Sequence, residues 1–227
     1  MNRPTQDEAR ARTRAIANES LQRGDALGWF ERLYAEANGD EARIPWADLD
    51  GHPLLVEWMR KHKVDGTGRR ALVVGCGLGE DAEVLARAGF DTMGFDVSPT
   101  AIEWCHKRFP NSTVRYEAAD LFAPPATWAR AFDFVFESYT LQALPADRRA
   151  GAFACIAQFI APGGELLVVT RAREPHEDTG ELPWPLLRSE LRTFEHFGLL
   201  EAAFEDIPDS GPADKPGRHL RVLYRAD

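Results

Sequence analysis

Short, wholly apolar runs alternate with amphipathic segments from residue 69 onward. The apolar runs predict strands, and segments with an apolar residue every three or four positions predict helices. The expected strands cover residues 71–74, 90–97, 113–117, 132–137 and 165–170, and the helices between them cover residues 80–88, 99–108 and 147–160. Strands that are apolar along most of their length are typical of a parallel sheet with helices on both faces.

The two ends of the chain have different patterns. Residues 6–37 predict one or two helices broken near two glycines, residues 39–53 a loop, and residues 53–63 a short helix. Residues 187–196 predict a helix, and residues 200–205 and 220–224 predict two strands joined by a turn and paired antiparallel. We therefore expect an α/β fold with a Rossmann-like, seven-stranded, mostly parallel doubly wound sheet. Residues 1–63 would form an N-terminal helical cap, and residues 64–227 the sheet domain.

The composition limits the partners of the protein. The chain has 27 Lys and Arg and 36 Asp and Glu among 227 residues, a net charge of −9. Such a surface argues against a nucleic-acid partner, which requires clustered cations. No apolar run approaches the roughly 18–20 residues of a membrane span, and the polar start is unlike a signal peptide. We expect a cytoplasmic monomer or homodimer with neither a membrane nor a nucleic-acid partner.

Three glycines follow the first predicted strand and open the next helix. Gly75, Gly77 and Gly79 would let the backbone approach a ligand at the helix N-terminus. A dinucleotide fingerprint requires a glycine where Glu80 stands, and Glu80 with Asp81 would repel a diphosphate. A phosphate-binding P-loop would continue with Gly-Lys-Ser/Thr, which does not follow. S-adenosylmethionine (SAM) carries an ammonium and a sulfonium and no phosphate, so the pattern favours SAM over a dinucleotide or a turn without a ligand.

Two carboxylates lie after the next two strands. Asp96 stands 17 residues past the last loop glycine, where doubly wound folds place a carboxylate against ribose hydroxyls. Asp120 follows the third strand, where it can accept from an adenine amino group while Leu121 or Phe122 packs near the ring. The alternative roles are a cap for the helix that starts after Ser98 and a simple turn residue.

Longer motifs around these residues carry a family resemblance. They are Val74-Gly75-Cys76-Gly77-Leu78-Gly79-Glu80-Asp81, Gly94-Phe95-Asp96-Val97-Ser98-Pro99, Asp120-Leu121-Phe122, Phe132-Asp133-Phe134-Val135-Phe136-Glu137 and Pro162-Gly163-Gly164. Together they resemble class I SAM-dependent methyltransferases, and within them the thiopurine methyltransferase family and its plant halide and thiol methyltransferase relatives. The similarity runs from about Trp29 to Tyr224 and is thinnest at residues 171–185, which should shape the acceptor pocket.

The resemblance implies a set of cofactor contacts. The loop glycines would line the methionine part of SAM, the two tryptophans would close over the sulfonium, and the end of the fourth strand would bring SAM and acceptor together. An aromatic wall suits a cation, although each tryptophan could equally be a core residue of the cap. We expect Cys76 to pack there rather than act as a nucleophile. The expected contacts are Trp29, Trp46, Gly75, Cys76, Gly77, Gly79, Asp96, Val97, Asp120, Leu121, Phe122 and Glu137.

The acceptor side is less defined by the sequence. Glu137-Ser138-Tyr139-Thr140 lacks the Asn/Asp-Pro-Pro-aromatic motif of adenine and glutamine-amide methyltransferases. The six histidines show no paired spacing, so we expect no metal site. A thiol is a few per cent thiolate at pH 7 and can react without a strong general base. Acid or base candidates are Tyr139, His52 and Asp50, followed by Asp48 and Arg173.

We therefore expect methyl transfer from SAM to a small-molecule acceptor, a thiol, with S-adenosylhomocysteine as product. The alternatives are O- or N-methylation of a small aromatic metabolite and a SAM-binding protein without catalysis. The intact glycine loop and both carboxylates argue against the last alternative.

Overall fold

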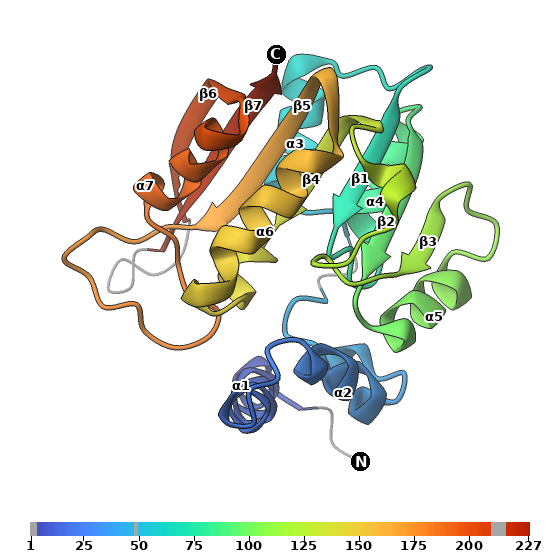
Figure 1. Ribbon diagram of the computed structural model, residues 1–227. Helices are drawn as coiled ribbons and strands as arrows, with labels where there is room; N and C mark the ends of the chain where they lie inside the picture. The colour runs from blue at the N-terminus through green and yellow to red at the C-terminus, as the bar shows by residue number, and fades with distance from the viewer. Residues whose placement is uncertain (1–3, 48–49, 210–216) are drawn as a thin grey trace.

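One seven-stranded sheet forms the centre of the molecule (Figure 1), in a computed structural model that describes residues 4–47, 50–209 and 217–227. The strand order is β3-β2-β1-β4-β5-β7-β6. The first five strands in the chain run parallel, and β7 is antiparallel to both β5 and β6. The strands are β1 (Arg70–Val74), β2 (Asp91–Asp96), β3 (Arg115–Ala118), β4 (Phe132–Ser138), β5 (Ile160–Arg171), β6 (Leu199–Pro208) and β7 (Arg218–Ala226). The expected fold class is confirmed.

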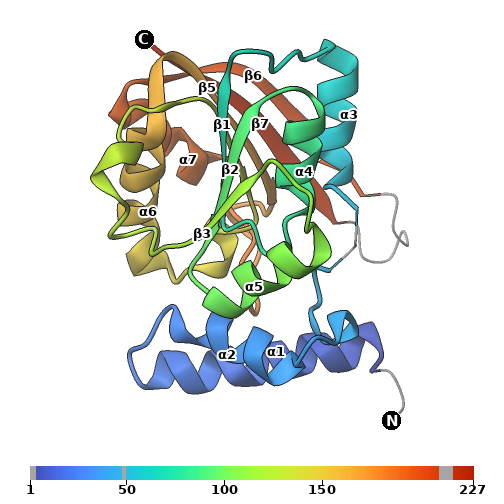
Figure 2. The same cartoon turned by 90° about the vertical axis from the view of Figure 1, so that its right-hand side faces the viewer.

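Helices cover both faces of this sheet (Figure 2). Alternate side chains of one strand point to opposite faces, so Leu72 and Val74 pack on the α6 side while Val73 packs on the α3, α4 and α5 side. The helices are α1 (Gln6–Gln22), α2 (Gly28–Ala37), α3 (Pro53–His62), α4 (Glu80–Arg87), α5 (Pro99–Arg108), α6 (Ala146–Phe159) and α7 (Arg188–Leu191). Short 3-10 turns are η1 (Glu41–Arg43), η2 (Ala126–Trp128), η3 (Leu141–Ala143) and η4 (Arg192–Phe197).

The first two helices form a separate layer beyond the C-terminal ends of the parallel strands (Figures 1 and 2). Their apolar faces enclose a core that includes Ile16, Trp29 and Leu33. Glu31 of α2 fastens this layer to α5, because its carboxylate accepts from Ser98 Oγ at 2.6 Å, from Thr100 Oγ1 at 2.6 Å and from Thr100 N at 3.1 Å. A carboxylate at a helix N-terminus is also favoured by the helix dipole.

Helix α3 packs on the sheet and not with α1 and α2. Trp58 of α3 stacks on Phe134 of β4 with ring centroids 5.5 Å apart, and Leu55 is fully buried in the same core. The sheet domain expected to begin at residue 64 therefore lacks one of its own covering helices. We propose that the cap comprises α1, α2 and η1, and that the boundary lies before Pro53.

Two expected elements differ in detail. The helix expected over residues 187–196 is one α-helical turn followed by the 3-10 helix η4. Residues three positions apart lie on the same side of a 3-10 helix, and Leu191 and Phe194 are both buried. Strand β5 begins at Ile160, ahead of the Pro162-Gly163-Gly164 turn signal, because an irregularity in the β4–β5 register accommodates it. Most of the expected turn near residues 208–217 lies outside the described residues. Among the described helices, none has the length and apolar character needed to cross a membrane.

Candidate active site

A cavity of about 410 Å³ lies between the cap and the C-terminal ends of the parallel strands. This is within the size range of small-molecule sites. Its wall includes residues at the ends of β1, β2, β4 and β5 and residues of α1 and α2. Twelve of the residues expected at the site line it: Trp29, Trp46, Asp50, His52, Gly75, Cys76, Gly77, Asp96, Val97, Leu121, Phe122 and Tyr139.

The glycine loop joins β1 to α4 with a left-handed backbone at three positions. Gly75, Gly77 and Gly79 have φ of 60°, 54° and 94°, a region that glycine enters without a steric penalty. A Cβ at Gly75 would lie 2.3 Å from Thr140 Oγ1, and one at Gly79 would lie 2.7 Å from Tyr116 Oη. Neither position could carry a side chain without a shift of its neighbour, so both glycines are required by the packing.

Asp96 ties this loop to the end of β2. Its carboxylate accepts from Gly77 N at 3.0 Å and from Ser98 N at 2.9 Å. The side chain is almost fully buried, and burial raises the pKa of Asp96 to about 6, against the opposing effect of the two backbone donors. Asp96 therefore organises the loop while it lines the cavity.

The carboxylates in the first turn of α4 have partners elsewhere in the protein. Glu80 forms an ion pair with Arg108, and Asp81 Oδ1 accepts from His52 N at 2.6 Å. Both carboxylates line the cavity. Cys76 packs against Gly94 of β2, and its hydrogen bond with Cys105 together with burial raises the pKa of its thiol. A thiol that stays protonated is a poor nucleophile, in agreement with the packing role expected for Cys76.

Aromatic rings from the N-terminal segment line the cavity next to the glycine loop, since a Cβ at Gly77 would lie 3.2 Å from Tyr34 Oη and 3.8 Å from Trp46 Nε1. Trp29 lies edge-on to Trp46 with centroids 6.3 Å apart, and Trp46 Nε1 donates to Tyr34 Oη at 2.9 Å. Trp29 is fully buried, yet its Nε1 has no hydrogen-bond partner among the described residues. Buried N–H donors are ordinarily satisfied, so this one is suited to meet a ligand.

Three expected cofactor residues lie outside the cavity lining. Gly79 is behind the loop against Tyr116, and Asp120 accepts from Phe122 N at 2.8 Å within its own turn. Glu137 is fully buried, accepts from Leu141 N at 3.0 Å, and has its pKa raised to about 7 by burial. Their direct contact with a cofactor remains a prediction, since each has a structural role that explains its position.

The acceptor side holds an arrangement that the sequence did not predict. His52 Nε2 lies 2.9 Å from Tyr139 Oη, Tyr139 Oη lies 2.7 Å from His219 Nε2, and His219 Nδ1 lies 2.6 Å from Asp209 Oδ1. All three rings line the cavity. His52 and Tyr139 were expected acid or base candidates, and the structure brings them together with two residues that were not expected. His219 and Asp209 were missed because their positions in the sequence carry no spacing signal.

Other acid and base candidates are placed differently. Asp50 lines the cavity but is exposed, and Asp48 lies outside the described residues. The Arg173 side chain is directed away from the cavity, where it donates to Pro185 O at 3.2 Å and lies 3.8 Å from Glu190. Arg173 is therefore structural. Arg171 and Arg10, which were not predicted, line the cavity instead.

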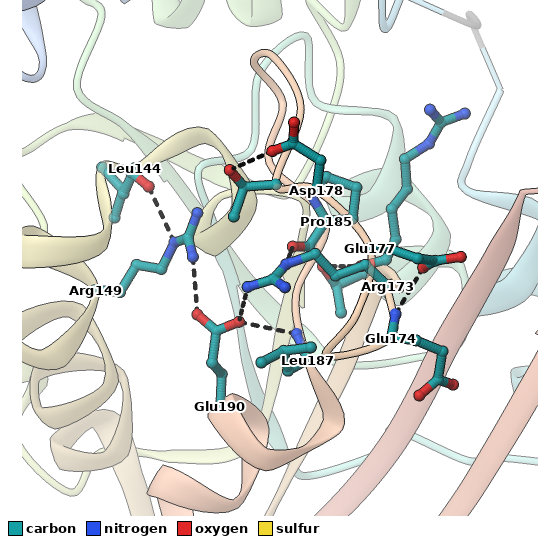
Figure 3. A network of polar contacts seen from close by, with 12 residues as sticks. Leu144, Arg149, Arg173, Glu174, Glu177, Asp178, Pro185, Leu187 and Glu190 are labelled. Atoms are coloured by element: carbon teal, nitrogen blue, oxygen red, sulfur yellow. Dashed lines mark hydrogen bonds and ion pairs between the residues drawn. The ribbon is translucent and has the colours of Figure 1, made fainter.

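A polar network holds the segment of residues 171–187 against α6 and α7 (Figure 3). Glu190 lies at its centre and accepts from Arg149 at 2.8 Å and from Leu187 N at 2.8 Å. Arg149 also donates to Leu144 O at 3.0 Å. Leu182 and Pro183 of this segment line the cavity, so the network fixes part of the acceptor wall.

Comparisons with known proteins place this site in a family. Residues 71–164 match a family model described as a methyltransferase domain. A probable thiol methyltransferase 2 from Arabidopsis thaliana is 33% identical over 94% of this chain and 90% of its own length. The chain belongs to the class I SAM-dependent methyltransferases. SAM is accordingly its cofactor, with S-adenosylhomocysteine as the product, and the resemblance to the thiol methyltransferases is confirmed.

Other matching proteins align over less of this chain. A ubiquinone biosynthesis O-methyltransferase from Erwinia tasmaniensis is 29% identical over 56% of this chain. The chain spans between 54% and 63% of the length of four such enzymes. The crystal structure of the N-methyltransferase NodS from Bradyrhizobium japonicum matches with a TM-score of 0.66 at 20% identity, covering 87% of this chain and 96% of that one. At this identity the likeness shows the shared fold.

The residues of this chain fit SAM as a ligand. The first turn of α4 brings the carboxylates of Glu80 and Asp81 to the cavity, whereas the basic residue of this helix, Arg87, lies in its last turn; this arrangement suits a cationic ligand without phosphates. Trp29 and Ser138 line the cavity. Trp29 Nε1 and Ser138 Oγ are buried and have no hydrogen-bond partner among the described residues. Asp96, the loop glycines and the two tryptophans would hold the cofactor.

Proposed function

We propose that this protein transfers the methyl group of SAM to a small-molecule acceptor, and that the acceptor is a thiol. One observation carries the proposal: a single cavity joins the glycine loop and Asp96 to the group of His52, Tyr139 and His219. The residues expected to bind the cofactor and those able to handle protons thus line the same cavity.

SAM supplies an electrophilic methyl group on a positively charged sulfur. The residues of this chain bind SAM and the acceptor, orient them, and exclude water. Asp96 and the loop form one part of the cavity wall, and Trp29 and Trp46 add aromatic rings to the same wall. The face of an aromatic ring attracts a cation. The cap covers the strand ends, so the acceptor is held in line with the methyl group away from bulk water.

The preference for a thiol rests on similarity and on chemistry. The plant relative that aligns over most of the chain is named a probable thiol methyltransferase. A thiol with a pKa of about 8.5 ionises far more readily than a phenol with a pKa of about 10. The second candidate is O-methylation of a small phenol, which the histidines beside Tyr139 favour because a phenol needs its proton removed.

The test combines binding with turnover. Thermal unfolding should show stabilisation by SAM and by S-adenosylhomocysteine, about 2.7 kcal/mol at a hundredfold excess over Kd, and none by NAD. Labelled SAM should then transfer its methyl group to thiols faster than to matched phenols and amines. Stabilisation by NAD equal to that by SAM, or tight SAM binding without transfer to any acceptor, would overturn the proposal.

A further inference from the structure

The two hydrogen bonds that join the Tyr139 hydroxyl to His52 and His219 run in one direction. Leu54 N donates to His52 Nδ1 at 3.2 Å, as the cap of α3, so that nitrogen carries a lone pair. A neutral imidazole has one N–H, and in His52 it is therefore on Nε2, which faces Tyr139 Oη at 2.9 Å. His52 donates, and the Tyr139 oxygen accepts.

The other half of the chain of bonds continues in the same direction. The Asp209 carboxylate lies 2.6 Å from His219 Nδ1, so His219 donates from Nδ1 and carries its lone pair on Nε2. Tyr139 Oη, 2.7 Å away, donates its proton to that lone pair. Carboxylate, imidazole and hydroxyl are then arranged in the order of a Ser-His-Asp triad, with a phenol in the place of the serine.

The backbone conformations at Tyr139 and Asp209 position their side chains. Tyr139 has φ of 64°, a left-handed conformation that costs a residue with a Cβ roughly 1–2 kcal/mol. It directly follows β4, so this conformation places the ring at the strand end. Asp209 is held at the base of the β6–β7 hairpin by its N–H to Gly217 O at 2.8 Å. A Cβ at Gly217 would lie 2.0 Å from Asp209 Oδ2, so a side chain there would displace the Asp209 carboxylate.

We propose that His219, oriented by Asp209, is the terminal proton acceptor for methyl transfer and receives the proton of the acceptor through the Tyr139 hydroxyl. This inference rests on the proposed function and narrows its substrates to acceptors that arrive protonated, such as alkylthiols and phenols. Acceptors that are already anions would not need the relay.

Each proton and each electron pair in the methyl-transfer step has a donor and an acceptor. The X–H bond of the acceptor breaks as its proton passes to Tyr139 Oη, while the proton of Tyr139 passes to His219 Nε2. The electron pair left on X forms the new bond to the methyl carbon, and the carbon–sulfonium bond breaks with its pair remaining on sulfur. His219, then an imidazolium paired with Asp209, releases its proton to solvent after the product leaves.

Both imidazoles are suited to be neutral before reaction. Burial lowers the pKa of His219, Arg171 acts in the same direction, and the Asp209 carboxylate opposes both. Burial lowers the pKa of His52 to about 4, with His219 and Arg221 acting in the same direction. The relay is then open near neutral pH and closes in acid as His219 becomes protonated.

The experiment compares two acceptors in the full-length protein. An alkylthiol is mostly protonated at pH 7, whereas an electron-poor arylthiol is already ionised. His219→Gln should slow transfer to the alkylthiol by about 10²–10⁴-fold, the usual effect of a general base, and transfer to the arylthiol by no more than severalfold. Tyr139→Phe should show the same selectivity. The matched control is His196→Gln, which changes an exposed histidine remote from the cavity.

Two further readouts separate the relay from a structural role. Raising the pH should restore the alkylthiol rate of His219→Gln, because hydroxide-dependent ionisation replaces the base. Asp209→Asn should lower the His219 pKa seen by NMR titration of the ring protons, independently of turnover. Equal losses on both thiols, an unchanged alkylthiol rate, or an unmoved His219 titration would overturn the relay. Failure of the wild-type protein to methylate any acceptor would instead overturn the proposed function.

Discussion

Asp96→Asn tests the carboxylate that joins the glycine loop to β2. An asparagine has the same shape but carries no charge and offers one oxygen, so its amide nitrogen must face either Gly77 N or Ser98 N. One charge-assisted hydrogen bond is lost and a donor opposes a donor. A hydrogen bond to a charged group contributes about 1.5–3 kcal/mol, which corresponds to roughly 10–150-fold in affinity when the ordered loop is needed for binding.

Calorimetry with SAM and with S-adenosylhomocysteine measures this loss directly. The wild-type affinity should also fall as pH drops through about 6, because protonation of Asp96 removes the charge that the two N–H donors require. Asp96→Asn should lack that acid limb. The matched control is Asp91→Asn, at the exposed first residue of the same strand. An affinity unchanged by Asp96→Asn, or equally weakened by Asp91→Asn, would refute the reasoning.

Three further predictions concern the cap and the core. Glu31→Gln should loosen the cap by about 1.5–3 kcal/mol, seen as faster amide exchange in α1 and α2, whereas Glu103→Gln on the exposed face of α5 should not. Trp29→Phe removes the unpartnered indole N–H but leaves a cavity at a fully buried position, so it should weaken SAM binding and also lower the free energy of unfolding by on the order of 1 kcal/mol. The folded pKa of Glu137, about 7, is above its usual 4.5, so its ionisation costs stability as pH rises between these values. Glu137→Gln should therefore be more stable than wild type by on the order of 3 kcal/mol near pH 8, with no such advantage near pH 4.5.

The cofactor side could be predicted because it is local in sequence. A strand, a glycine turn and a helix lie within residues 70–87, and the turn glycines carry their own conformational signature. The apolar runs of β1 and β4 also identified a buried sheet without reference to tertiary contacts. The residue types within this short segment were therefore sufficient to predict the strand, the glycine turn and the helix.

The relay could not be predicted in this way. Tyr139 and His219 are 80 positions apart, and they meet because β7 pairs with β5 in an antiparallel register that places His219 opposite Arg171. Sequence reasoning found the antiparallel strands but not that β7 inserts between β5 and β6. The order of strands decided which side chains reach the cavity, and no periodicity carries that information.

The cofactor part and the acceptor part of the cavity wall come from different elements, and this determines how the acceptor specificity can change. The loop and Asp96 are held by bonds between neighbouring strand ends, whereas the acceptor wall is assembled from the cap, the end of β4, the segment held by Glu190 and the start of β7. Substitutions in the second group leave the Asp96–Gly77 bond intact. A related chain could therefore accept a different nucleophile by altering His219, Tyr139 or the Leu182–Pro183 wall while it keeps the same cofactor. The thin resemblance at residues 171–185 falls in the part of the molecule where such changes would alter the acceptor and leave SAM binding unaffected.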